Sequence, residues 1–135
     1  MRLCGVGCAF IRRGRGGNAA ETGAYLVKGI AGCGNCHTAR DRPMKGVELA
    51  EGNSFGGPKA PFQSNAANIK PDLGTGIGAW TNAQIKRAIT NGVFHNGAKM
   101  RPPMCYCCYD KMTEADVDAV VSYLRTIKPI KNNLR

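Results

Sequence analysis

The 135-residue chain has few aromatic residues, few acidic residues and no long hydrophobic run. Its rings are one Trp, four Tyr and four Phe, against 18 Gly. Apolar residues make up 43% of the chain but are scattered, which argues against a segment that crosses a bilayer. The length predicts one soluble domain that buries about two thirds of its unfolded surface. Because large side chains that fill a core are scarce, we expect something else to fill it.

The scarcity of acidic residues gives a formal charge of +10, from 19 Lys and Arg against nine Asp and Glu. A basic charge favours an acidic partner, but it does not by itself distinguish nucleic acid, an anionic membrane and an acidic protein. Four of the arginines lie in the first fifteen residues, which contain no acidic residue, so the rest of the chain carries +6. The N-terminal segment is therefore considered separately.

Residues 1–17 are predicted to lie outside the folded domain. Arg2 and the apolar stretch Leu3–Ile11 resemble an export signal, but glycines interrupt the stretch and Arg12-Arg13 follows where a small-residue cleavage site is expected. The segment is either a degenerate or truncated export signal or a disordered basic tail. Residues 18–131 are assigned to the domain and residues 132–135 to a C-terminal tail.

Three segments have the spacing of amphipathic helices, and no segment has the pattern of a strand. The first helix is predicted over Glu21–Ala31, ending at Gly32. It places on one side Tyr25, Leu26 and Ile30. The second is predicted to begin after the N-cap Thr81 and to stop at Asn91-Gly92. Its apolar positions at helical spacing are Ile85, Ala88 and Ile89.

The third helix has the clearest signals. Thr113 is the predicted N-cap, Asp116 completes a carboxylate version of the capping box, and Pro129 ends the helix. Its apolar stripe is Val117, Val120, Val121, Leu124 and Ile127. Residues 38–79 have no sustained period, and so long a connection is expected to wrap something. The chain is therefore predicted to be all-α with long loops.

Cys33-Gly34-Asn35-Cys36-His37 is the most informative short motif. In the C-x-x-C-H spacing, two thiols add across the vinyl groups of a haem, and the adjacent His is held beneath the ring as an iron ligand. We predict one covalent haem c attached through Cys33 and Cys36, with His37 as the proximal ligand. This haem would also fill the core.

Two haem-free interpretations of the same cysteines stay open. Cys33 and Cys36 resemble the dithiol of a thioredoxin-like oxidoreductase, although no apolar strand precedes them. The same pair could join two later cysteines in a four-sulfur zinc site, which leaves His37 without a role. Those later cysteines are Cys105, Cys107 and Cys108.

A six-coordinate iron needs a second axial ligand, and the chain offers several side chains for it. Met104 follows Pro102-Pro103, which stiffen the backbone, and lies between two predicted helices. We predict that Met104 is this distal ligand. The alternatives are Met100, His95, Met44 and Met112.

Four segments in this order resemble the class I c-type cytochromes: CGNCHT, NIKPDLGTGIGAWT, GAKMRPPM and the terminal TEADVDAVVSYLRTIKPI. The resemblance covers about Gly23 to Ile130 and is closest to the monohaem domains in the cytochrome subunits of bacterial dehydrogenases. It implies a cytochrome c-like fold, in which three main helices and long loops wrap one covalently bound haem. It also implies that Asn68 and Trp80 line the haem pocket, along the propionates.

The function implied by the resemblance is electron transfer, one electron at a time, from a dehydrogenase to a downstream acceptor in the periplasm. One alternative is a subunit permanently docked in a dehydrogenase complex, and a minor one is a zinc- or disulfide-stabilised module without haem. The implied partners are redox proteins with acidic docking surfaces, and not nucleic acid. Two basic groups would face them: Arg40, Arg42 and Lys45, and Lys99, Arg101 and Lys111.

The chain departs from the resemblance directly after Met104, where Cys105-Tyr106-Cys107-Cys108 follows. Three interpretations are open: a thiolate that competes for the iron, a redox-sensitive disulfide, or small buried side chains in place of others. A disulfide between the neighbours Cys107 and Cys108 would be strained. With Cys4 and Cys8, five of the seven cysteines have no assigned role.

Overall fold

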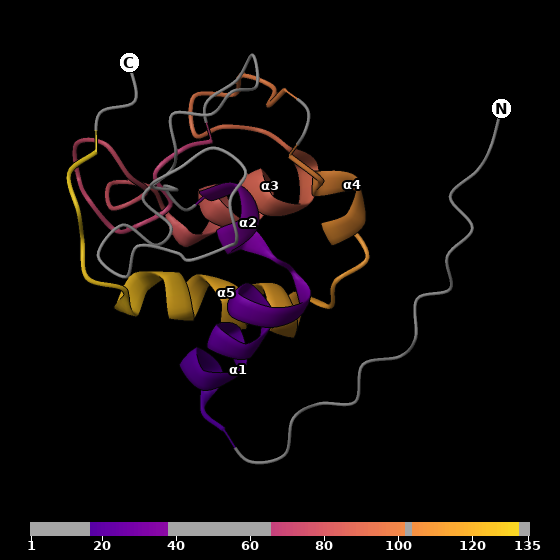
Figure 1. Ribbon diagram of the computed structural model, residues 1–135. Coiled ribbons are helices and arrows are strands. Elements are labelled where there is room, and N and C mark those ends of the chain that lie inside the picture. Colours follow the sequence, from indigo (N-terminus) through magenta and orange to yellow (C-terminus); the bar gives the residue numbers. More distant parts are fainter. Residues whose placement is uncertain (1–16, 38–65, 102–103, 133–135) are drawn as a thin grey trace, which may run out of the picture.

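The computed structural model describes residues 17–37, 66–101 and 104–132 (Figure 1). Their elements are α1 (Ala19–Tyr25), the π-helix η1 (Leu26–Ile30), α2 (Cys33–His37), α3 (Asn82–Asn91), α4 (Tyr106–Tyr109) and α5 (Glu114–Thr126). Within these ranges there is no strand, only an isolated bridge between Val93 and Lys99. None of the described helices is both long and apolar enough to span a membrane. The predicted all-α architecture is confirmed.

The predicted helix ends at Thr81 and Gly92 are also confirmed. The Thr81 hydroxyl accepts from the Gln84 backbone N–H at 3.2 Å, and the Gln84 side chain accepts from the Thr81 N–H at 2.8 Å. Gly92 closes α3 with a left-handed backbone at φ 64°. This pair of caps makes α3 a short helix with defined ends.

The N-terminus of α5 differs in one detail from its prediction. Thr113 is the N-cap and accepts from the Asp116 backbone N–H at 3.2 Å. The Asp116 carboxylate, however, accepts the Thr113 hydroxyl hydrogen at 2.7 Å, so this bond takes the place of the reciprocal bond expected of a capping box. The short Asp116 side chain reaches the Thr113 hydroxyl more readily than it reaches the backbone N–H of Thr113. At its other end α5 stops at Thr126, with Ile127 already extended, slightly before the end at Pro129 that the sequence predicted.

The first helix was predicted with the wrong start and partly the wrong face, while its end directly before Gly32 is confirmed. It begins earlier, at Ala19, because Asn18 and Glu21 form a capping box. From Leu26 the backbone continues as a π-helix, whose wider turns rotate the following side chains away from the 3.6-residue pattern. Leu26 and Val27 are buried, whereas Ile30 is 50% exposed. Tyr25, the last residue of α1, is 58% exposed as well, which the π-helix does not explain.

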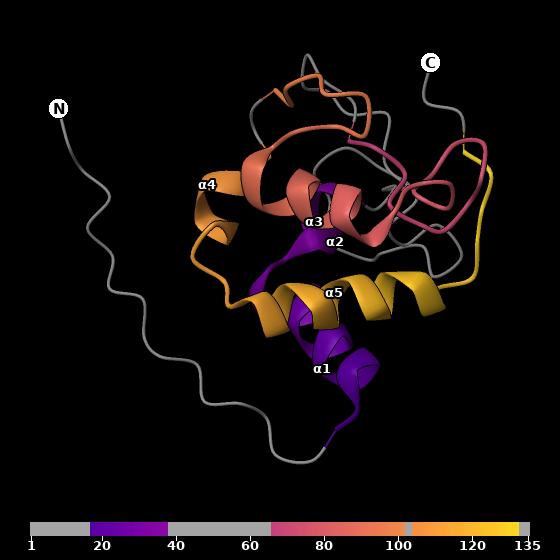
Figure 2. The ribbon, with the colours of Figure 1, turned by 180° about the vertical axis from the view of Figure 1, so that it is seen from behind.

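Helix α1 crosses α5, its main partner, and the two views in Figures 1 and 2 show this crossing from opposite sides. The backbones approach most closely at Gly23. A Cβ atom there would lie 1.9 Å from the Ala119 carbonyl oxygen and 2.7 Å from the Tyr123 Cβ. The crossing therefore requires a residue without a side chain at position 23.

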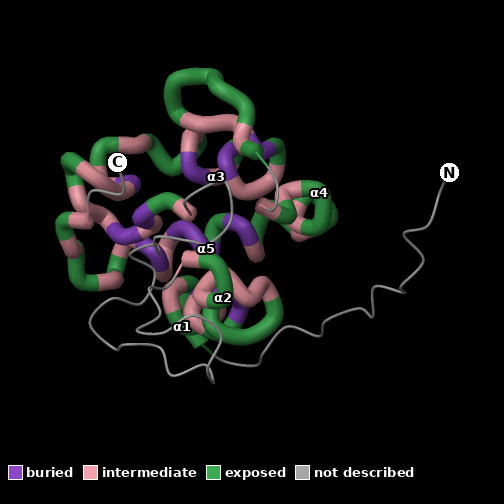
Figure 3. The backbone as a smooth tube through the Cα atoms, turned by 45° about the horizontal axis from the view of Figure 1, so that its top comes forward, coloured by how far each residue is buried: buried purple, intermediate pink, exposed green. Residues whose placement is uncertain are grey.

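The core is small and aliphatic. Figure 3 shows buried backbone along α5, α3 and the loop before α3, while α4 is only half-buried or exposed. The core residues are Leu26, Val27, Ile77, Ile85, Ala119, Val120, Val121 and Leu124. No aromatic side chain is fully buried among the described residues. The stripe predicted for α5 is confirmed, since Val117, Val120, Val121 and Leu124 are buried and Ile127 is partly buried at the edge of the core.

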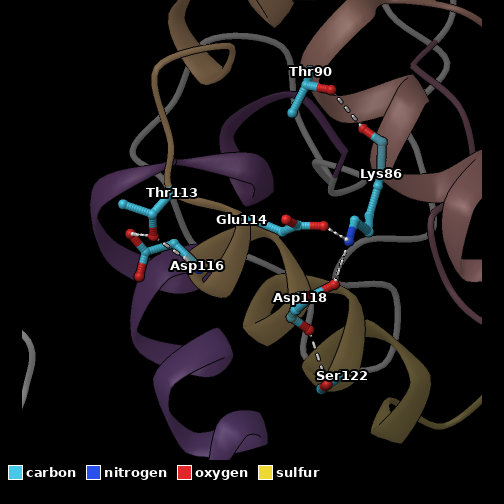
Figure 4. A network of polar contacts seen from close by, with 7 residues as sticks. All are labelled: Lys86, Thr90, Thr113, Glu114, Asp116, Asp118 and Ser122. Atoms are coloured by element: carbon cyan, nitrogen blue, oxygen red, sulfur yellow. Dashed lines mark hydrogen bonds and ion pairs between the residues drawn. The ribbon is translucent and has the colours of Figure 1, made fainter.

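A polar network joins α3 to α5 on the surface (Figure 4). The Lys86 ammonium lies 3.0 Å from a Glu114 carboxylate oxygen and 2.7 Å from an Asp118 oxygen. Both carboxylates are more than half exposed, so water and salt screen them. The network therefore aligns the two helices more than it stabilises them.

The loop that precedes α3 folds around the Asp72 carboxylate. One carboxylate oxygen accepts from the Thr75 backbone N–H at 2.6 Å, the Thr75 hydroxyl at 2.7 Å and the Gly74 N–H at 3.2 Å. These bonds, first of all that from the Thr75 hydroxyl, lower the pKa of Asp72. The charged carboxylate is therefore the form that holds the loop.

Replacing Gly23 with Ala is expected to lower the free energy of unfolding by about 1–3 kcal/mol, because the new methyl group must displace the α5 backbone. Urea unfolding followed by far-ultraviolet circular dichroism measures the change. Gly29→Ala is the matched control, since its Cβ would have nothing within 4 Å and the chain should lose no stability. Equal losses in both variants would contradict the close crossing.

Replacing Asp72 with Asn is expected to destabilise the chain near neutral pH and less so in acid. A lowered folded-state pKa stabilises above the unfolded value of about 3.9, and this contribution disappears as the pH falls through the folded value. Urea unfolding at several pH values should therefore show a difference between the two chains that shrinks towards acid. Asp110→Asn, which removes an exposed pair with Lys111, should cost less.

Candidate functional site

Helix α2 follows the end of η1 and carries the CGNCH motif, with its potential haem-binding residues Cys33, Cys36 and His37. Gly32, with a left-handed φ of 58°, separates the two helices, and the Asn35 N–H donates to its carbonyl at 2.9 Å. Cys33 is half-buried against the core and Cys36 is exposed, both as free thiols. Burial raises the pKa of Cys33 to about 11, so this thiol keeps its proton.

The His37 ring is fixed in one tautomer by the loop opposite. Its Nδ1 atom lies 2.7 Å from the Ala67 carbonyl oxygen, which can only accept, so Nδ1 carries the hydrogen. Burial lowers the pKa of His37, and the bond to Ala67 opposes this shift. A neutral imidazole with Nδ1 protonated has its lone pair on Nε2, which is the form that binds a metal.

The candidate distal ligands lie at different depths. Met104 and Met100 are half-buried, whereas His95 is exposed and its ring lies 4.6 Å from that of Trp80. Met112 packs at the edge of the core, where it serves as an ordinary apolar side chain. Met44 and Pro102-Pro103 lie outside the described residues.

Tyr109 connects the segment after Met104 to the end of η1, directly before the CGNCH helix, and sequence reasoning missed it. Its hydroxyl donates to the Ala31 carbonyl at 2.6 Å. Burial raises the pKa of Tyr109 to about 12, and the neighbouring thiols, Cys33 foremost, add to the shift. The phenol therefore stays a neutral donor. No local pattern reveals this bond, because its partners are 78 residues apart.

Asn68 is buried and its amide closes the loop onto the C-terminal segment. The side-chain NH₂ donates to the Ile130 carbonyl at 2.8 Å and to the Thr75 hydroxyl at 3.2 Å, while its oxygen accepts from the Lys70 N–H at 3.1 Å. Both amide hydrogens are thus engaged within the protein. The role that the structure shows for Asn68 is to hold the loop.

Trp80 packs against the core from the end of the same loop. Its ring meets Phe94 edge-on at 6.3 Å and lies tilted against His95. Arg125 of α5 donates to the backbone carbonyls of Ile77 and Gly78 at 3.2 Å and to that of Trp80. The loop from Asn68 to Trp80 is therefore fixed at both ends.

The three later cysteines form a group that does not include Cys33 and Cys36. In the described part of the chain, the group of three or more potential metal-binding side chains consists of Cys105, Cys107 and Cys108 alone. All three are exposed, so they are not the small buried side chains that one interpretation required. The four-sulfur zinc site with Cys33 and Cys36 is likewise not assembled.

The basic groups predicted beside the site are only partly described. Lys99, Arg101 and Lys111 are exposed, and Lys111 lies 3.2 Å from an Asp110 carboxylate oxygen. The other group, Arg40, Arg42 and Lys45, lies outside the described residues, as do Cys4 and Cys8. The exposed charge of the first group is consistent with a docking surface.

The donor set fits a c-type haem. Two free thiols and a neutral imidazole lie on one short helix, with the Nε2 atom of His37 left available by the bond at Nδ1. Free thiols of this spacing are the groups that form thioether links, and imidazole is a ligand of haem iron.

Comparisons with known proteins agree with this donor set. A family model described as cytochrome c matches residues 20–128. The chain is 36% identical over 110 residues to the fructose dehydrogenase cytochrome subunit of Gluconobacter japonicus, covering 80% of this chain and 21% of that protein. It is 32% identical over 111 residues to the cytochrome c subunit of a quinone alcohol dehydrogenase of Gluconacetobacter polyoxogenes, covering 82% and 22%.

A third relative is the gluconate 2-dehydrogenase cytochrome c subunit of Pantoea cypripedii, 31% identical over 103 residues, covering 76% of this chain and 22% of that protein. The chain therefore spans about a fifth of the length of these relatives. The match of the family model over most of the chain, together with the helical fold, shows that the chain belongs to the cytochrome c family.

Proposed function

We propose that this domain binds one haem c through Cys33 and Cys36, with His37 and Met104 as axial ligands, and carries single electrons. When bound, the haem supplies a couple between ferrous and ferric iron. The observation that carries the proposal is the bond from His37 Nδ1 to Ala67, beside two free thiols. It leaves the imidazole in the form that ligates iron.

Each ligand has a separate role. His37 is oriented by a backbone carbonyl, so that its ring stays in one rotamer and one tautomer. Met104 offers a neutral thioether, and a His/Met pair raises the potential of the iron relative to two His ligands. The hydrogen bond from Tyr109 to Ala31 holds the segment after Met104 against the end of η1, directly before the CGNCH helix.

The loop from Asn68 to Trp80 is proposed to lie along the haem propionates. Asn68 acts there as a positioning residue, because both of its amide hydrogens hold the loop itself. Trp80 contributes its half-buried ring to the pocket wall and its indole N–H as a donor. Arg125 fixes the end of the loop from α5.

The proposed electron donor is a dehydrogenase, and the electron transfer is proposed to take place in the periplasm. The relatives are named as cytochrome subunits of dehydrogenases for fructose and alcohol, and each of them is several times longer than this chain. The exposed Lys99 and Arg101 would favour an acidic docking surface, with association that weakens as salt rises. Size-exclusion chromatography of the native protein separates a free carrier, which runs as a small monomer, from a docked subunit.

An absorption spectrum of protein matured in a haem-attaching host tests the proposal. Sharp ferrous α and β bands and one haem per chain by pyridine haemochrome are expected. Their absence in chains that carry Cys33 and Cys36 would refute the proposed function and leave a haem-free module.

Met104→Ala is expected to abolish the red methionine-to-ferric charge-transfer band, because it removes the proposed thioether ligand. Met100→Ala, which also shortens a half-buried methionine nearby, should leave the band unchanged. The measurement is the absorption spectrum of the oxidised protein. Loss of the band in Met100→Ala and not in Met104→Ala would reverse the assignment.

Tyr109→Phe is expected to lower the free energy of unfolding by about 1 kcal/mol, because one buried hydrogen bond is lost. If Tyr109 positions Met104, the temperature at which the charge-transfer band disappears should also fall. Tyr25→Phe is the control, since Tyr25 is 58% exposed and should change neither quantity. If the band disappears at the same temperature in Tyr109→Phe as in the unchanged protein, Tyr109 stabilises the fold but does not position Met104.

A further inference from the structure

Three cysteines on and beside α4 bring their sulfur atoms together at the surface. The Sγ atoms of Cys105, Cys107 and Cys108 all lie within 4.8 Å of one another. Those of Cys105 and Cys108 are in direct contact at 2.9 Å. The single turn Tyr106–Tyr109 produces this grouping, because it folds positions 105 and 108 onto the same side.

The spacing of these sulfurs is close to that of a metal–thiolate site. With a metal–sulfur bond of about 2.3 Å and three sulfurs spread around the ion, two of them are about 4.0 Å apart. Rotation of exposed side chains is enough to reach this spacing from the one observed. A disulfide, by contrast, would join two sulfurs at about 2.0 Å and leave the third thiol unused. It is the presence of three sulfurs in one group that favours an ion.

We propose that Cys105, Cys107 and Cys108 form a site for one thiophilic metal ion in three-coordinate geometry, of which Cu⁺ is the biological example. Thiolates are soft ligands and select soft ions. Zinc usually takes four protein ligands at a structural site, and this group offers three. Binding releases the three thiol protons and transfers no electron, so the reaction needs no oxidant.

The site is distinct from the proposed haem attachment. Thioether links consume the thiols of Cys33 and Cys36, whereas the three cysteines on and beside α4 are separate from them and exposed. One Cu⁺ on three thiolates has a net charge of −2. The chain has a formal charge of +10, so this added negative charge meets an overall positive electrostatic environment. The proposal therefore does not depend on which redox partner the domain serves.

The test uses the full, haem-loaded chain in a Cys4→Ser, Cys8→Ser background, so that the proposed site holds its only free thiols. Cu⁺ is added without oxygen in competition with a cuprous chelator, and native mass spectrometry and a haem assay are run on the same sample. One copper per haem is expected. Serine at any one of the three positions should weaken Cu⁺ binding about tenfold or more. Tyr106→Phe, in the same turn, should keep full affinity.

Alkylation of the haem-loaded Cys4→Ser, Cys8→Ser background gives a second measurement, which needs no substitution at the proposed site. Bound Cu⁺ should protect three thiols from iodoacetamide, and removal of the ion should expose all three. The proposal is overturned if Cys107→Ser keeps full affinity, if Zn²⁺ binds more tightly than Cu⁺, or if no copper is retained. A Cys105–Cys108 disulfide that survives under reducing conditions would overturn it as well. The haem assay separates these outcomes from a failure of haem attachment.

Discussion

The close approach of two helix backbones at Gly23 is the constraint on which the rest of the structure depends. Only a residue without a side chain lets α1 reach the Ala119 carbonyl of α5. This contact sets where η1 runs over α5, and therefore where Gly32 turns the chain into the CGNCH helix. The candidate site thus depends on a crossing between the first and last described helices, and a methyl group placed there acts on the site from a distance.

Single polar side chains, rather than a continuous apolar core, hold the loops around the site. Asn68 bonds to the Ile130 carbonyl, Tyr109 to that of Ala31, and Arg125 to carbonyls of the loop before α3. Loops lack the regular hydrogen bonds of helices and sheets, so their buried carbonyls need such donors. The aliphatic core lies mostly between the helices. The geometry around His37 is therefore sensitive to residues that do not touch it.

Features that depend on neighbours in sequence could be predicted, and those that depend on distant partners could not. The caps at Thr81 and Thr113 and the apolar stripe of α5 follow from local spacing and are confirmed. Ile30 was placed on the wrong face because a π-helix leaves no signature in a 3.6-residue pattern. Tyr109 had no signal at all. The CGNCH motif identified the donors at once, but the tautomer of His37 required Ala67 in place.

The cysteine cluster and the proposed iron ligand share one short piece of backbone. Met104 directly precedes Cys105, and α4 has four residues, far fewer than an isolated helix needs to be stable. Contacts with the rest of the fold must therefore hold it, and these include packing against α3 and the hydrogen bond of Tyr109 at its far end. An ion held by three sulfurs would add one more contact that holds α4. It would also reduce the conformational entropy that the chain loses when Met104 binds the iron. The cysteines that follow Met104 would then act on a proposed axial ligand, and axial ligands are among the groups that set the potential of haem iron.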